Sequence, residues 1–235
     1  MSVLNHGFVP AADALIFPEI CMLCHADLSA ASGLCSCCEE RMEPLPTERC
    51  AGCGGRLDTV VELCRECLPM KRPWELAVSC YGFHGAAREA VLRFKYSGDT
   101  ALASLLGAVM AENWQAYGHA KAEAVTAVPL HWFKELRRGF NQSQLLAEHV
   151  GCHLDLPAPK LLRRTRWTRS QAGLNLARRR RNLQRAFAAG NGVTVPEHVI
   201  LVDDVLTTGS TLAACTRALR KAGALQVSVL SVARG

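Results

Sequence analysis

The sequence has no apolar run long enough to cross a bilayer, and its N-terminus lacks the basic start of a secretion signal. The longest apolar helical stretch, Ala101–Ala111, ends at Glu112. The glycine-rich pattern GxGxxG is absent, and no GKT or GKS follows the glycine turn near Gly209. These absences argue against a dinucleotide-binding fold and a nucleoside-triphosphate loop. The absence of a membrane-spanning run and of a secretion signal predicts a soluble, cytoplasmic protein.

Acidic residues are scarce in the second part of the chain. Residues 1–74 hold 6 Lys and Arg against 10 Asp and Glu, whereas residues 75–235 hold 21 against 11. With 235 residues, 49% of them hydrophobic, the chain is long enough for one sizeable core and a small appendage. The charge asymmetry predicts two domains, 1–74 and 75–235, joined near Pro69–Trp74. The larger one is expected to meet anionic partners such as phosphates or nucleic acid.

Nine of the twelve cysteines lie between Cys21 and Cys67. Eight of them form four CxxC pairs, separated by 10, 11 and 10 residues: Cys21/Cys24, Cys35/Cys38, Cys50/Cys53 and Cys64/Cys67. This rhythm is typical of two successive zinc ribbons, in which each knuckle supplies two thiolates to a tetrahedral site. So small a segment, poor in apolar residues, needs such a metal to fold. The pattern predicts one or two structural Zn²⁺ sites.

Several alternatives stay open for the cysteines. An iron–sulfur centre could use the same ligands, whereas disulfides are disfavoured because a bond within CxxC closes too short a loop. Cys37 adds a thiol beside Cys38, and the CxxC spacing favours Cys38 as the ligand. Sequential pairing of the knuckles is favoured over interleaved pairing.

The segment VILVDDVLTTGST, residues 199–211, is the most informative stretch of the second part. Val199–Val202 is an apolar, mostly β-branched run typical of a strand buried on both faces of a parallel sheet, where ligands bind at the carboxyl end. Five small residues then open a helix: Thr207, Thr208, Gly209, Ser210 and Thr211. Their backbone amides can close around a phosphate. Asp203 and Asp204 would repel that anion unless they accept hydrogen bonds from sugar hydroxyls.

This segment resembles the 5-phosphoribosyl-1-pyrophosphate (PRPP) motif of type I phosphoribosyltransferases. The resemblance implies that Asp203 and Asp204 bind the ribose hydroxyls and that residues 207–211 bind the 5′-phosphate. The alternative is an ordinary strand–turn–helix corner whose Thr and Ser residues cap the helix. Capping alone does not explain two acids before the turn.

Strands and helices alternate along the rest of the second part, which predicts an α/β domain with a parallel sheet and helices on both faces. Strands are expected at Leu76–Phe83, Ala124–Leu130 and Gln226–Ala233. Helices are expected at Ala86–Phe94, at Thr100–Tyr117, at Gln142–Val150 and from the small residues 207–211 to Gly223.

Three polar segments accompany these elements. A tight loop, Phe94–Asp99, could bind pyrophosphate through its amides and Lys95. The junction RRGFNQ offers hydrogen-bond donors from Arg138, Asn141 and Gln142. Residues 160–185 hold ten Lys and Arg and no acid, a composition that does not predict a packed core. Trp167 among these arginines suggests single-stranded nucleic acid, although a mobile basic loop is the plain alternative.

Taken in order, the cysteine pairs, FKYSGD, PLHWFKELRRGFNQ, RTRWTRSQAGLNLARRRRNLQRAF and VILVDDVLTTGST are similar to the ComF family, which includes the GntX-like proteins. The resemblance implies a zinc-ribbon domain before a type I phosphoribosyltransferase-like domain, in a family linked to natural transformation and single-stranded DNA. It implies that Lys95, Ser97 and Gly98 belong to a pyrophosphate loop. Residues for nucleic acid or substrate are then Arg138, Asn141, Gln142, Gln171, Arg178, Arg179, Arg181 and Asn182.

Two functions remain open. The first is an enzyme that transfers the phosphoribosyl group of PRPP to an unknown acceptor with Mg²⁺, with Asp203, Asp204 and Lys95 as catalytic residues. Positioning and electrostatics would supply most of the barrier reduction. The second is a binding module that holds PRPP or nucleic acid without turnover, while the zinc domain docks a partner protein, such as another competence protein.

Overall fold

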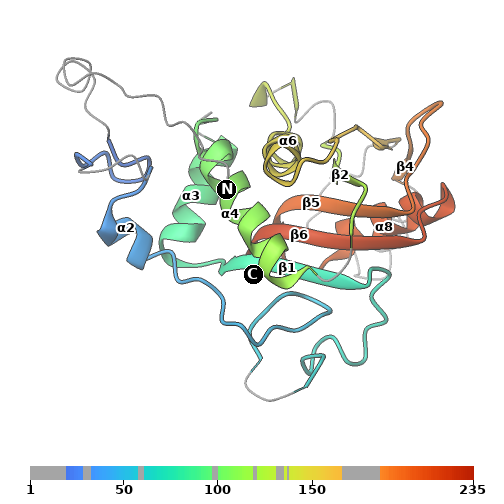
Figure 1. Ribbon diagram of the computed structural model, residues 1–235, viewed down its shortest axis with the longest axis horizontal. Coiled ribbons are helices and arrows are strands. Elements are labelled where there is room, and N and C mark those ends of the chain that lie inside the picture. Colours follow the sequence, from blue (N-terminus) through green and yellow to red (C-terminus); the bar gives the residue numbers. More distant parts are fainter. Residues whose placement is uncertain are drawn as a thin grey trace, which may run out of the picture.

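The computed structural model describes residues 20–28, 33–57, 61–96, 100–118, 121–130, 135–136, 138–165 and 186–235. Within these ranges the molecule combines a cysteine-rich N-terminal segment with an α/β part built on one four-stranded sheet (Figure 1). None of the described helices has both the length and the apolar character needed to span a membrane.

The sheet is parallel throughout and follows the order β1-β6-β5-β2. Its strands are β1 (Leu76–Gly82), β2 (Ala124–Ala127), β5 (His198–Leu206) and β6 (Gln226–Arg234). The two central strands are buried over most of their length because helices cover both faces of the sheet. Burial on both faces explains the continuous apolar runs in the sequence.

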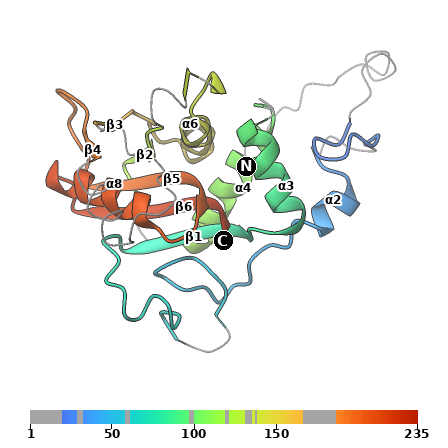
Figure 2. The same cartoon turned by 180° about the vertical axis from the view of Figure 1, so that it is seen from behind.

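Helices α3 (Gly85–Tyr96), α4 (Leu102–Tyr117) and α6 (Gln142–Leu154) pack on one face, in a core with Ile200 and Val202 of β5. Helix α8 (Ser210–Lys221) packs on the other face, with Val199 and Leu201. The alternation along β5 therefore sends successive side chains into separate cores. Figure 2 shows the same two layers from behind. The predicted α/β fold, with a parallel sheet and helices on both faces, is confirmed.

Two predictions about local structure were wrong. The predicted loop Phe94–Asp99 begins in a helix, since α3 continues through Lys95 to Tyr96. The basic segment 160–185 was predicted not to contribute to a core, but Leu161 and Leu162 are buried. Leu162 lies in β3 (Leu162–Arg164), which forms an antiparallel pair with β4 (Phe187–Ala189) beside α8. The apolar start of this segment thus packs, whereas residues 166–185 lie outside the described ones.

The part of the N-terminal segment that follows its short helix α2 (Ser36–Glu40) lies along β1, the edge strand of the sheet (Figure 1). The amide of Leu45 donates to the carbonyl of Cys80, and the amide of Ala77 donates to the carbonyl of Ala51. Gly54, at φ +66°, lies so close that a Cβ there would come 2.7 Å from the amide nitrogen of Ser79. These contacts cover part of an edge that would otherwise expose unpaired backbone groups.

Side chains of the N-terminal segment enter both cores. Leu23, Leu34 and Met42 pack in the core beneath α3 and α4, and Cys67 and Trp74 pack in the core beneath α8. The division into domains 1–74 and 75–235 stays a prediction.

Candidate functional site

The cysteine pairs form two separate sulfur clusters. Cys21, Cys24, Cys35 and Cys38 make one, Cys50, Cys53, Cys64 and Cys67 make the other, and within each the sulfur atoms lie within 4.8 Å of one another. The sequential pairing of knuckles is therefore confirmed. Cys38 is 1% exposed and belongs to the first cluster, whereas Cys37 is exposed to solvent. Cys38, the thiol that the CxxC spacing favours, is therefore the one that lies with the other three.

Both clusters suit structural Zn²⁺. Four thiolates around one point make a closed tetrahedral donor set without a position for substrate. Backbone amides support the sulfur atoms: Leu23 N lies 3.4 Å from Cys21 Sγ, and Cys64 N lies 3.2 Å from Cys50 Sγ. Donors of this kind stabilise metal-bound thiolates. We call the groups of Cys21 and Cys50 the first and second zinc sites.

The phosphate turn, residues 207–211, connects β5 to α8. Thr207 and Thr208 are exposed, and Gly209 adopts the left-handed conformation with φ +72°. Helix α8 starts at Ser210 without a side-chain cap, although Thr208 Oγ1 lies 3.0 Å from Ser210 Oγ and accepts from Ser210 N at 3.4 Å. An uncapped helix start of this kind presents free N–H groups and a positive dipole end to an anion.

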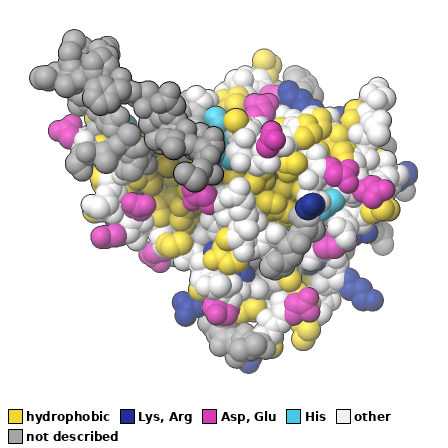
Figure 3. Space-filling model, viewed as in Figure 1, with side chains coloured by type: hydrophobic (Ala, Val, Ile, Leu, Met, Phe, Trp, Pro, Cys, Tyr) yellow, Lys and Arg dark blue, Asp and Glu magenta, His cyan; other side chains and the backbone are white. Residues whose placement is uncertain are grey.

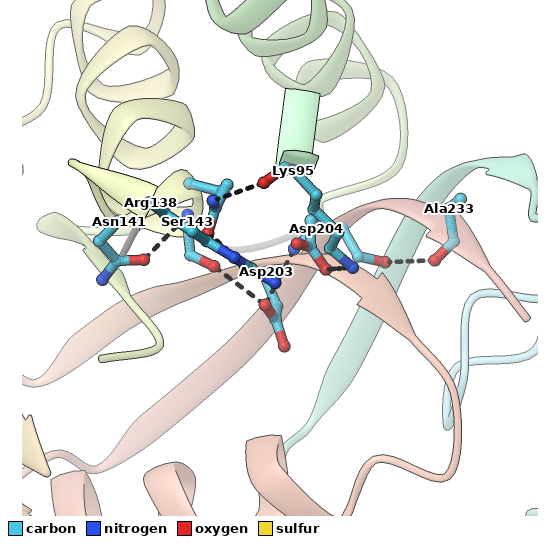
Figure 4. A network of polar contacts seen from close by, with 9 residues as sticks. Lys95, Arg138, Asn141, Ser143, Asp203, Asp204 and Ala233 are labelled. Atoms are coloured by element: carbon cyan, nitrogen blue, oxygen red, sulfur yellow. Dashed lines mark hydrogen bonds and ion pairs between the residues drawn. The ribbon is translucent and has the colours of Figure 1, made fainter. Parts of the chain in front are cut away.

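Asp203 and Asp204 lie within the last part of β5, at the carboxyl edge of the sheet. Asp204 is 8% exposed, and its Oδ1 lies 2.8 Å from the Nζ of Lys95. Asp203 Oδ1 accepts a hydrogen bond of 2.9 Å from Ser143 Oγ of α6 and one of 3.0 Å from the amide of Asp204. Figure 4 shows how these side chains from α3, α6 and β5 meet. The structure thus brings Lys95 together with the two predicted acids.

Burial raises the pKa of Asp203 to about 7, with the negative charge of Asp204 as a second cause. The hydrogen bond from Ser143 and the charge of Lys95 act in the opposite direction but do not cancel the rise. The carboxyl group of Asp203 therefore changes its charge near neutral pH.

The predicted residues of the RRGFNQ junction lie beside this pair. Arg138 Nη1 donates to Gln142 Oε1 at 2.9 Å, and its guanidinium lies 5.0 Å from the ring centre of Tyr96. Gln142 Nε2 reaches the carbonyl of Lys95 at 3.5 Å. Asn141 caps α6 by accepting from Ser143 N at 3.2 Å. These residues join α6 to the last turn of α3, and their contacts with a ligand stay predictions.

Sequence reasoning missed Ser143, which is 5% exposed and donates directly to Asp203. The only sequence signal for Ser143 was its position next to the predicted Gln142, because no local pattern links residue 143 to residue 203. Some predicted site residues lie outside the described ones: Ser97, Gly98, Gln171, Arg178, Arg179, Arg181 and Asn182.

Known proteins are similar to this chain in sequence and in structure. Residues 12–68 match the model of a double zinc ribbon domain. The chain is 33% identical over 222 residues to competence protein F of Haemophilus influenzae, covering 91% of this chain and 96% of that protein. It is 31% identical over 229 residues to DNA utilization protein YhgH of Escherichia coli K12, covering 94% and 99%. A glutamine phosphoribosylpyrophosphate (PRPP) amidotransferase from B. subtilis, complexed with ADP and GMP, matches with a TM-score of 0.42 and 21% identity, over 59% of this chain and 30% of that one.

The thiol assignment predicts different zinc contents for two neighbouring variants. Cys38→Ser removes a buried ligand of the first zinc site, so the purified protein should hold one zinc fewer per chain than the wild type. Cys37→Ser is the matched control and should keep the wild-type zinc content. Colorimetric zinc release after denaturation measures both. Equal zinc contents in the two variants would contradict the assignment.

The raised pKa of Asp203 predicts a pH-dependent stability. Because the pKa rises from 3.8 to about 7 on folding, the contribution of this group is complete below about pH 4 and is lost as the pH rises through about 7. Asp203→Asn cannot ionise and should escape this loss. The variant should therefore gain stability relative to the wild type between about pH 5 and pH 8, as measured by urea unfolding. Asp155→Asn, at the exposed end of α6, controls for the chemical change and should keep the wild-type slope. A variant that follows the same slope at position 203 contradicts the assignment.

Proposed function

Because the chain belongs to the ComF family of competence protein F and DNA utilization protein YhgH, we propose that it binds PRPP with Mg²⁺ at the carboxyl end of β5 and acts on single-stranded DNA during natural transformation. The observation that carries the PRPP part is the continuity of the site along one short segment. Asp203 and Asp204 lie near the carboxyl end of β5, which ends at Leu206, and the phosphate turn follows this residue and opens α8.

The two halves of this segment match two parts of one ligand. Free amides at the start of α8 suit a phosphate monoester. The carboxylates of Asp203 and Asp204 suit neutral hydroxyl donors such as those of a ribose, because a hydroxyl can donate to a carboxylate that would repel a second anion. A sugar phosphate satisfies both halves at once, whereas a free phosphate would leave the buried acids without new partners.

Lys95 supplies a cation for the third part of PRPP, its pyrophosphate. Its Nζ pairs with Asp204, and both side chains are largely buried. The ammonium group of Lys95 stands at the end of a flexible side chain, so it can move towards a pyrophosphate bound next to the acids. Mg²⁺, which prefers carboxylate and phosphate oxygens, would enter with PRPP and neutralise part of its negative charge.

Transfer at this site would need little acid–base chemistry. The bond between the anomeric carbon and the pyrophosphate oxygen breaks, pyrophosphate leaves with the electron pair, and the acceptor forms the new bond to the same carbon. Positive charge that develops on the ribose would lie beside the carboxylates of Asp203 and Asp204, while Lys95 attracts the leaving group. The proposed catalytic residues are therefore Asp203, Asp204 and Lys95.

Calorimetric titration with PRPP and Mg²⁺ tests the ligand. The wild type should bind with measurable heat, and Asp203→Asn combined with Asp204→Asn should weaken binding by at least about tenfold, because the ribose hydroxyls lose two charged acceptors. Asp155→Asn controls for general effects of the change. If titration of the wild type with PRPP and Mg²⁺ produces no heat of binding, the proposal is wrong. Pyrophosphate release, followed across bases and ammonia, then separates an enzyme from a binding module, since a module shows affinity without turnover.

The DNA role rests on the names of the relatives and on the basic sequence of residues 160–185. On the face shown in Figure 3, acidic side chains are spread over the surface and the Lys and Arg side chains stand apart from one another. This face therefore offers a nucleic acid little concentrated positive charge among the described residues. The arginines of the basic segment are the better candidates. A cytoplasmic location and a protein partner at the zinc sites belong to the same proposal.

Salt dependence tests the basic segment. Replacing Arg178, Arg179 and Arg181 by Ala should reduce the slope of log affinity for single-stranded DNA against log salt by about 0.7 for each DNA phosphate that the variant no longer neutralises. The control removes three exposed cations elsewhere, Arg88, Lys121 and Lys221, and has the same net charge. An unchanged slope in the first variant, or an equal fall in the control, excludes a specific role for the segment. Fluorescence anisotropy at several salt concentrations provides the slopes.

A further inference from the structure

An arginine from the zinc-binding part donates a hydrogen bond to the backbone of the phosphate turn. Arg72 Nη1 donates to the carbonyl oxygen of Thr208 at 2.7 Å. Its Nη2 lies 3.8 Å from the Sγ of Cys67, a ligand of the second zinc site. One planar guanidinium thus joins a zinc-site sulfur to the turn, which is 136 residues away in the sequence.

A second arginine makes a similar connection between the end of β5 and the second zinc site. Arg234, at the end of β6, donates from Nη1 to the carbonyl of Leu206 at 3.4 Å. Its Nη2 lies 3.2 Å from Glu66, which stands between Cys64 and Cys67 in the second zinc site. Together, Arg72 and Arg234 hold the carbonyls of residues 206 and 208, at the point where the strand becomes the turn. We call these two side chains the arginine clasp.

The turn also packs directly on the clasp. A Cβ at Gly209 would come 2.8 Å from Arg72 Nη1 and 2.8 Å from the ring of Trp74. Trp74 is 4% exposed, and its Nε1 donates to the carbonyl of Gly52 in the second zinc site at 3.0 Å. The position of the glycine is therefore set by residues that are themselves attached to the zinc-site backbone.

The direction of these hydrogen bonds bears on phosphate binding. In an extended or turn peptide unit the carbonyl and the N–H point to opposite sides of the chain. Groups that bind the carbonyls of 206 and 208 from behind leave the neighbouring N–H groups free to face a ligand. Amides fixed in advance bind an anion more tightly, because less ordering is left for the binding event.

We propose that the second zinc site, through the arginine clasp, positions the phosphate turn for its ligand. The inference rests on the proposed function, since the ligand is the 5′-phosphate of PRPP. A zinc ion with four thiolates carries a net charge of −2, and Arg72 and Arg234 supply two positive charges next to it. Arg72 is a positioning residue that acts on the phosphate through the peptide backbone.

A direct contact between Arg72 and the phosphate is the competing explanation. Arg72 lines a cavity of about 350 Å³ beside the turn, together with Arg217 of α8. If Arg72 acted on the phosphate only through its positive charge, Arg217 would act in the same way, and loss of either arginine would weaken anion binding. Arg217 is exposed and serves as the matched control, because it lines the same cavity from the helix surface.

Two measurements on the full-length, zinc-loaded protein test the clasp. Hydrogen–deuterium exchange of the amides of residues 207–211 reports the turn without any ligand, and calorimetry with ribose 5-phosphate reports its binding. Arg72→Ala should speed exchange in the turn and weaken ribose 5-phosphate binding about tenfold while the zinc content stays at the wild-type value. Arg72→Lys keeps the charge but loses the two-pronged geometry, so it should also speed exchange. Arg217→Ala should leave both measurements unchanged.

The zinc side of the proposal has its own pair of variants. Cys64→Ser disturbs the second zinc site and should speed exchange in residues 207–211, whereas Cys24→Ser, in the first site, should leave that exchange at the wild-type rate. Wild-type exchange in both Arg72→Ala and Cys64→Ser overturns the proposal, and so does an equal loss of affinity in Arg217→Ala. If wild-type protein fails to bind ribose 5-phosphate, the proposed function fails, and the exchange data still decide whether the clasp orders the turn.

Discussion

The charge balance at the buried end of β5 constrains the whole site. Asp203 and Asp204 are adjacent, partly or largely removed from water, and lie near the carboxyl end of β5, a strand that is buried on both faces. Two carboxylates there are tolerated only with compensating partners, which Lys95 of α3 and Ser143 of α6 provide. Helices from separate parts of the chain are thus arranged around one pair of acids. A ligand with hydroxyl groups and a compensating cation fits the same requirement.

The cysteine-rich segment contributes more than an appendage to this arrangement. Its side chains enter both cores, its backbone covers the edge strand β1, and its second zinc site reaches the phosphate turn through Arg72 and Arg234. A metal site contributes folding energy to the residues around it. The parts of the site therefore differ in their support: the acids depend on the helices above the sheet, and the turn depends on the zinc-binding part beside it.

Patterns confined to a few residues were readable from the sequence. The CxxC spacing identified the zinc ligands and favoured Cys38 over Cys37, and the run from Val199 to Thr211 located the acids and the turn. Contacts across many residues were not readable, which is why Ser143 and Arg72 were missed. The end of α3 was misjudged because Gly98 suggested a loop, whereas burial of Phe94 keeps the last helical turn packed. β3 and β4 were missed because each has only three residues, and their apolar side chains flank a strongly basic segment.

A crystal structure of the zinc-loaded protein with PRPP and Mg²⁺ tests the central claim most directly. The account predicts the 5′-phosphate at the amides of residues 207–211, the ribose hydroxyls on Asp203 and Asp204, and Lys95 turned from Asp204 towards the pyrophosphate. PRPP bound elsewhere, for example with its phosphate against Arg217 and the Lys95–Asp204 ion pair intact, would contradict it.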